Sequence, residues 1–196
     1  MSVTVTSKVP NIICEPISHN FSQRVTPIKK ICLHETGAHG DPQSWFNNPA
    51  AEASATYCIM ANGQIKQYLS EEVKAWACGL PAYMFKPNYN GPHKPSYQYM
   101  LLDANNIYID PNSYFLSIEF EKTDSEDWSK AGLKSLTSLM ADIAHRYGFA
   151  IDREHVAGHH QIWDGHVCPG LGCPFDEIII TAAAKLAGLA PQQINS

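Results

Sequence analysis

Residues 158–170 contain an unusual density of side chains that bind metals. They read GHHQIWDGHVCPG, with three histidines and one cysteine. Catalytic zinc sites take three protein ligands, commonly His, Cys or a carboxylate, and leave a fourth position open. His159 and Cys168 lie nine positions apart in this segment (168 minus 159), and His34 stands far upstream. One ligand on a strand and two on a loop that folds over it would provide three corners of a tetrahedron.

Cysteine chemistry without a metal is the alternative use of this segment. Cys168 could act as the nucleophile of a hydrolase, with a nearby histidine as its base. Pro169 follows directly and has no backbone N–H to contribute to an oxyanion hole, which disfavours this alternative.

Two strands are expected to position the upstream candidates. In residues 28–34, IKKICLH, the alternation places His34 on the face opposite Ile31 and Leu33. Residues 115–121, FLSIEFE, alternate in the same way and turn Glu119 away from Ile118.

The remaining elements indicate an α/β fold. Residues 56–69 predict a hairpin around Asn62-Gly63, since this dipeptide tolerates the positive φ of a tight turn. Apolar residues at helical spacing predict helices over about 128–147 and 176–186, and residues 41–48 predict a short helix with Asp41 as N-cap. This order predicts one domain over 1–196, with a central mixed β-sheet flanked by helices. The histidine-rich segment is expected to be a loop between the two long helices.

Residues 81–112 differ in composition, with five prolines, five tyrosines and little periodicity. A long loop inside a compact domain is usually functional or disordered. We expect an ordered insertion that forms a wall beside the site, with tyrosines suited to contact sugar or peptide: Tyr83, Tyr89, Tyr97 and Tyr99.

Composition excludes several classes of partner. The 196 residues have a formal charge of −5, with 44% apolar and 17% charged residues, so nucleic acid is not expected as a partner. No apolar run is long enough for a transmembrane helix, and the N-terminus does not resemble a secretory signal. We expect synthesis in a bacterial cytoplasm; the oligomeric state is not determined by the sequence. Of the six cysteines, Cys32, Cys58 and Cys78 lie within apolar stretches and are expected to be buried thiols, while the disulfide status of the chain is left open.

The chain resembles the zinc-dependent N-acetylmuramoyl-L-alanine amidases of the amidase-2 and peptidoglycan-recognition-protein family. The similarity runs in order over about residues 17–186 and rests on these segments: ISHNFSQR (17–24), ICLHETG (31–37), SATYCIMANGQIKQYL (54–69), AWACG (75–79), SIEFE (117–121), GHHQI (158–162) and CPG (168–170).

The resemblance implies a role for each candidate residue. It assigns Zn²⁺ to His34, His159 and Cys168, with His160 as the less favoured alternative to His159. Glu119 matches the catalytic carboxylate of recycling-type members, which would take a proton from water and pass it to the leaving nitrogen. His166 stands where many members have a lysine, and would donate a hydrogen bond to the oxyanion.

At one further position, the alignment with the family allows two neighbouring residues. Tyr57, or Thr56 beside it, corresponds to a tyrosine that other members place near the metal. AWACG also lacks the histidine that many relatives have after the tryptophan, so one substrate contact is expected to be absent.

The expected function is hydrolysis of the amide bond between N-acetylmuramic acid and L-alanine in peptidoglycan. A cell-wall-lytic endolysin, acting on the wall after release, is favoured by the tyrosine-rich insertion and by His166. Two alternatives remain: a cytosolic enzyme that recycles 1,6-anhydro-muropeptides, and a module that binds muropeptides without cutting them. Noncatalytic relatives usually lack the cysteine ligand, so Cys168 disfavours the binding module.

Overall fold

A six-stranded mixed β-sheet forms the centre of the molecule, with the strand order β1-β5-β4-β7-β3-β8. The computed structural model describes residues 7, 9–81, 84, 90–123, 128–170 and 172–189. The sheet strands are β1 (Ile12–Cys14), β3 (Lys30–His39), β4 (Tyr57–Ile59), β5 (Ile65–Gln67), β7 (Phe115–Lys122) and β8 (Val156–Gly158). Strands β4, β7, β3 and β8 run parallel, whereas β4 and β5 form an antiparallel hairpin. A separate pair, β2 (Phe21–Gln23) and β6 (Val73–Ala75), is antiparallel.

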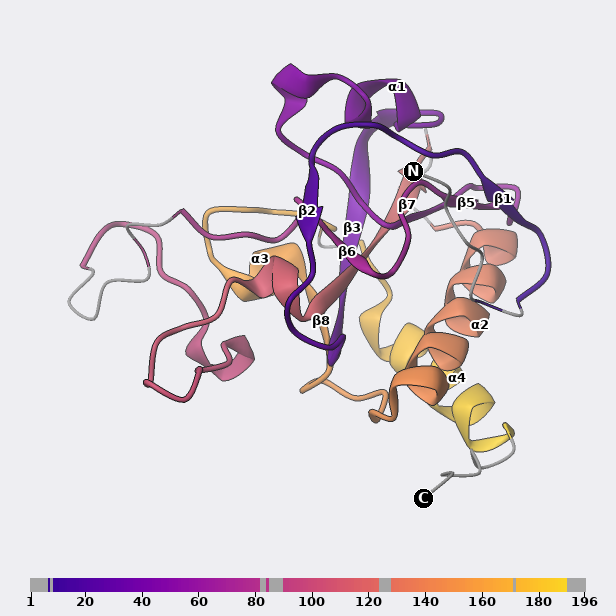
Figure 1. Cartoon of the computed structure of the whole chain (residues 1–196). Helices are drawn as coiled ribbons and strands as arrows, with labels where there is room; N and C mark the ends of the chain where they lie inside the picture. Colours follow the sequence, from indigo (N-terminus) through magenta and orange to yellow (C-terminus); the bar gives the residue numbers. More distant parts are fainter. Residues whose placement is uncertain are drawn as a thin grey trace.

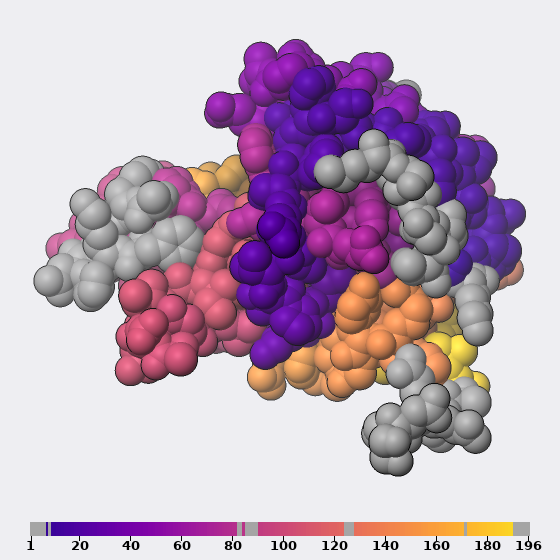
Figure 2. All heavy atoms as spheres, in the orientation of Figure 1, coloured from indigo at the N-terminus to yellow at the C-terminus, as the bar shows by residue number. Residues whose placement is uncertain are grey.

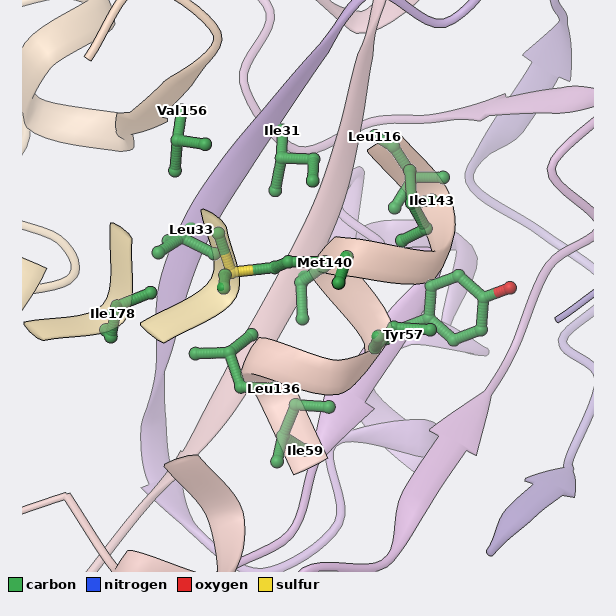
Figure 3. Packing of buried hydrophobic residues seen from close by; sticks show 14 of the residues in the cluster. Ile31, Leu33, Tyr57, Ile59, Leu116, Leu136, Met140, Ile143, Val156 and Ile178 are labelled. Atoms are coloured by element: carbon green, nitrogen blue, oxygen red, sulfur yellow. The ribbon is translucent and has the colours of Figure 1, made fainter. Parts of the chain in front are cut away.

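Two long helices cover one face of the sheet. These are α2 (Lys130–Tyr147) and α4 (Phe175–Ala187), which lie side by side in Figure 1. Figure 3 shows Leu136, Met140 and Ile143 of α2 packed among apolar side chains of the strands. Ile31 and Leu33 of β3 belong to this cluster, which leaves Cys32 and His34 on the opposite face. The helices therefore occupy one face, and the polar residues of the strands lie on the other.

Most of the predicted elements are present. Both long helices, the two strands and the hairpin form where the sequence predicts them, and Gly63 in the hairpin turn has a φ of 87°. The short helix α1 spans only Gln43–Phe46, and Pro42 is its N-cap residue, while the carboxylate of Asp41 accepts a hydrogen bond from the Gln43 N–H. The prediction of α/β architecture with helices flanking a mixed sheet is confirmed.

The histidine-rich segment differs from the predicted loop. The edge strand β8 leads into this segment, and the helical turn α3 (His159–Ile162) follows directly after β8. Three-residue strands such as β8, β1, β2 and β6 have too few positions to show alternation, so sequence periodicity does not detect them.

The described part of the insertion lies on the side of the sheet opposite the long helices, next to α3 (Figure 1), and it stands out from the body in Figure 2. It contains two short 3₁₀ turns, Tyr97–Tyr99 and Pro111–Ser113. Tyr99 is buried and Tyr97 is exposed, so only Tyr97 of this pair can offer its ring to a partner. Tyr83 and Tyr89 lie outside the described residues. Among the described helices, none is long and apolar enough to span a membrane.

Candidate metal centre

The register of three parallel strands brings the candidate ligands to one place. His34 of β3 is paired directly with Glu119 of β7. On the other side of β3, Leu33 is paired with Gly158 of β8, so His159 begins α3 beside His34. Sites of α/β proteins commonly form at the carboxyl ends of strands in this way.

His34, His159 and Cys168 converge on a common point. Their candidate ligand atoms all lie within 4.8 Å of one another. The Sγ of Cys168 is 3.7 Å from Nδ1 of His34, near the ~3.6 Å expected for two ligands of one tetrahedral zinc ion. The two histidines are 3% and 7% exposed, so both imidazoles are removed from bulk water.

The donor set indicates which ion could bind here. Nδ1 of His34 faces the Sγ of Cys168, so this nitrogen, and not the buried Nε2 of the same ring, is placed to share an ion with the thiolate. A set of two imidazoles and one thiolate suits zinc, a borderline-soft ion. The residues present therefore fit a zinc ion.

Cys168 is held by two backbone contacts. The Glu35 N–H donates to its Sγ over 3.2 Å. Its carbonyl accepts from the backbone N–H of His160 at 2.8 Å and lies 2.9 Å from the His160 ring nitrogen Nδ1. A Cβ on Gly158 would lie 2.7 Å from Pro169 Cδ, so a glycine is required for this loop to approach the strand. His160 thus supports the loop and is not in the group that could hold a metal.

The contribution of Glu35 was not predicted from the sequence. Its N–H position beside Cys168 depends on how the distant loop folds over β3, and no local pattern indicates this.

Burial sets the protonation of the metal-free site. Burial, with repulsion from His166, lowers the pKa of His34 to about 3. Burial and the neighbouring histidines lower the pKa of His159 to about 2. Both imidazoles are therefore neutral at neutral pH, as metal ligands must be. Burial, with nearby Glu119, raises the pKa of Cys168 to about 12, so its thiol is protonated until a cation binds.

Glu119 is a buried acid next to the ligands. Burial, with repulsion from Glu35, raises its pKa to about 8. Its Oε2 is buried and unpaired among the described residues. Glu119 and Glu35 also line a pocket of about 560 Å³ that extends along the end of β3 to α1. A carboxylate with a pKa close to neutrality, at the edge of a pocket, is suited to proton transfer.

His166 lies over the site from the solvent side. Its ring stacks on His159 with centroids 3.8 Å apart and an angle of 19° between the planes. Burial against these neighbours lowers the pKa of His166. This is the position from which an imidazole could donate to a group bound beside His159.

The expectation for Tyr57 does not hold in the structure. Tyr57 is paired with Ile118 and packs in the core on the helix-covered face, as Figure 3 shows. Its hydroxyl donates to Glu71 at 2.8 Å, and Glu71 also accepts from Arg146. Side chains alternate between the two faces along a strand, and Tyr57 is paired with Ile118, so Tyr57 lies on the face opposite Glu119. Its neighbour Thr56 is buried, with Oγ1 unpaired among the described residues.

Zinc binding is expected to release protons and to tighten as the pH rises. At pH 7 Cys168 is protonated in the metal-free site and must lose its proton to bind, while His34 and His159 have none to lose. Glu119 adds up to one more proton, because a nearby cation favours its carboxylate. Affinity should rise about tenfold per pH unit for each proton released.

Titration calorimetry of zinc binding, in buffers of different ionisation enthalpy, measures this release. The expected value is one to two protons per zinc, lower in Glu119→Gln. Binding without proton release would show that Cys168 is not a ligand.

Comparison with known proteins agrees with this site. The family Amidase_2, described as N-acetylmuramoyl-L-alanine amidase, matches residues 24–171 of the 196-residue chain. No curated protein matches the chain in sequence.

Several solved structures share the fold. The selenomethionine derivative of AmpD is 18% identical with a TM-score of 0.65, over 92% of this chain and 99% of that chain. N-acetylmuramoyl-L-alanine amidase LysC from Clostridium intestinale URNW is 17% identical with a TM-score of 0.58, over 91% and 98%. Staphylococcus aureus hydrolase AmiA in complex with its ligand is 15% identical with a TM-score of 0.62, over 94% and 89%.

The family match covers most of the chain and includes every candidate residue named above from His34 to Cys168. The protein belongs to the Amidase_2 family of enzymes, the N-acetylmuramoyl-L-alanine amidases.

Proposed function

We propose that this amidase is zinc-dependent and that His34, His159 and Cys168 hold the ion. The observation that supports this most strongly is the convergence of three ligand atoms, from two buried histidines and one cysteine, within 4.8 Å of one another. When bound, zinc supplies Lewis acidity and lowers the pKa of water to about 7. The substrate is the amide bond between N-acetylmuramic acid and L-alanine in peptidoglycan.

Glu119 acts as general base and then as general acid. It takes a proton from the attacking water and returns it to the leaving alanine nitrogen. Register places Glu119 directly beside His34, and its Oε2 makes no competing hydrogen bond to the described residues. A positioned proton-transfer group contributes about 10²–10⁴-fold to the rate.

His166 donates a hydrogen bond to the oxyanion that forms at the scissile carbonyl. His166 is exposed and its ring is stacked on His159, so the imidazole can reach a substrate that enters from solvent. Removal of one oxyanion donor typically costs about 10²–10³-fold in kcat. Loss of this donor alone is therefore expected to leave a slow enzyme and not an inactive one.

Removal of the metal is the direct test. Chelation of zinc is expected to abolish release of stem peptide from purified cell walls, and stoichiometric zinc should restore it. Magnesium is the control addition, since a site of nitrogen and sulfur ligands does not suit it. Cleavage that continues at full rate in metal-free protein would refute zinc dependence.

The same assay separates the two other readings of the site. A binding module would retain muropeptide with the amide intact after long incubation. A cysteine hydrolase would be inactivated by iodoacetamide and would need no metal. The raised pKa of Cys168 keeps its thiol protonated in the metal-free protein, which opposes the second reading.

We propose polymeric cell wall as the substrate, in the manner of an endolysin. The support is the insertion beside the site, with the exposed ring of Tyr97 available to a long substrate. Comparison of kcat/KM for polymeric wall and for a soluble anhydro-muropeptide tests this. Preference for the small substrate would instead indicate a recycling enzyme.

A further inference from the structure

Trp163 has no role in the proposed chemistry, yet its ring contacts the proposed oxyanion donor. The indole and the His166 imidazole have centroids 4.8 Å apart at an angle of 68°, an edge-to-face contact. The His166 ring is also stacked on His159, with centroids 3.8 Å apart. No hydrogen bond holds the His166 ring among the described residues, so packing by these two rings sets its orientation.

The backbone of Trp163 is fixed by the insertion. Pro95 and Trp163 form an antiparallel bridge. On either side of it, the Ser96 N–H donates to the Ile162 carbonyl at 2.7 Å, and the Lys94 N–H donates to the Asp164 carboxylate at 2.8 Å. This clamp ties residues 94–96 of the insertion to the segment that leads into His166.

The indole itself packs between the insertion and the loop. It lies against a small apolar cluster of Leu80, Met84 and Met100, against which Tyr108 also packs. The chain also passes close to the ring at Gly165, where an added Cβ would lie 2.4 Å from the indole. The buried Nε1 has no partner among the described residues, so packing and not a hydrogen bond holds the ring.

We propose that Trp163 is a positioning residue through which the insertion orients His166 for catalysis. An imidazole donates only along its ring N–H directions, so an oxyanion donor of this kind must be held at a set angle. The exposed loop around His166 provides no such restraint by itself. The inference rests on the proposed function and adds a role for residues 94–96 and for Trp163.

Kinetics of three variants test the role. Trp163→Ala is expected to lower kcat tenfold to about 10²-fold, because a small misplacement of a catalytic group can cost that much. KM should change less than about twofold and zinc content should stay at one per chain. Trp163→Phe keeps a smaller aromatic ring against His166 and breaks no hydrogen bond, because the indole N–H is unpaired among the described residues, so it should lower kcat much less than Trp163→Ala does. Ile107→Ala is the control, since Ile107 is an exposed residue of the same insertion.

A double-mutant cycle separates positioning from a general loss of structure. In a His166→Ala background, Trp163→Ala is expected to change kcat less than about twofold, because the group it orients is gone. An equal loss of kcat in both backgrounds would overturn the inference.

NMR gives a readout that does not depend on activity. In zinc-loaded protein with labelled histidine, contacts between the ring protons of His166 and His159 should be present in wild type and Trp163→Phe, and lost in Trp163→Ala. Persistence of these contacts in Trp163→Ala would also overturn the inference. A wild type that cleaves no substrate overturns the proposed function together with this role, whereas an active wild type with an unaffected Trp163→Ala variant overturns this role alone.

Discussion

Glu119→Gln is expected to lower kcat by about 10²–10⁴-fold while the protein keeps its zinc. Glutamine has nearly the same shape as glutamate but cannot take a proton from water. Because Glu119 is not among the candidate ligands, zinc content per chain should not change. Steady-state release of stem peptide from cell walls, with zinc measured by mass spectrometry on the same sample, checks both statements.

Glu121→Gln is the matched control for this variant. Glu121 lies on the same strand and the same face, two residues further on, but its carboxylate accepts hydrogen bonds from the backbone N–H groups of Gly40 and Ala61. An amide cannot accept both, so this variant should lose about 1–3 kcal/mol of stability and keep its kcat. Equal kcat losses in the two variants would mean that Glu119 has a structural role only.

Stability provides a second signature of Glu119. The folded protein holds the pKa of this carboxyl at about 8, above its ordinary value of 4.5. Between pH 4.5 and about pH 8, the folded state therefore binds more protons than the unfolded state. The metal-free protein becomes less stable as the pH rises through this range, because unfolding then releases the Glu119 proton. Glu119→Gln should remove that contribution and raise the melting temperature of metal-free protein at pH 8.

Cys168→Ala is expected to reduce zinc affinity by more than about 100-fold and to abolish activity at ordinary zinc concentrations. Loss of a residue that only orients a metal ligand already costs about 10–100-fold in metal affinity. Cys168 is itself one of the three candidate ligands among the described residues, so its loss should cost more. Zinc retained after dialysis against a competing chelator measures the loss. The stabilisation of the fold by added zinc should disappear at the same time.

Cys173→Ala is the control for Cys168→Ala. Cys173 is a half-buried thiol whose pKa burial raises to about 12, and it packs against the main core. It does not belong to the group that could hold a metal. This variant should keep its zinc and its kcat. Retention of zinc by Cys168→Ala would instead refute the proposed ligand set.

The sequence by itself predicts the two long helices, the hairpin and two central strands, and it names candidates for the site. Alternation in residues 28–34 and 115–121 identified the strands and the face of each side chain, and the helices followed from apolar spacing, because these patterns depend only on local geometry. The resemblance to the family, carried by an ordered set of motifs, indicates the candidate site residues: His34, Glu119, His159, His166 and Cys168. In the structure His159 belongs to the group that could hold a metal, whereas the ring of His160 contacts the carbonyl of Cys168.

Only the tertiary structure decided how these residues meet. The pairing of β3 with both β7 and β8 sets His34 beside Glu119 and His159, and the partner of a strand is not encoded in its own alternation. Tyr57 shows the cost of an uncertain register, since a shift of one residue moves a side chain to the opposite face of a sheet. The contact of Trp163 with His166 depends on the insertion folding back over the loop. Contacts between segments this far apart in the chain arise from packing, which local sequence patterns do not specify.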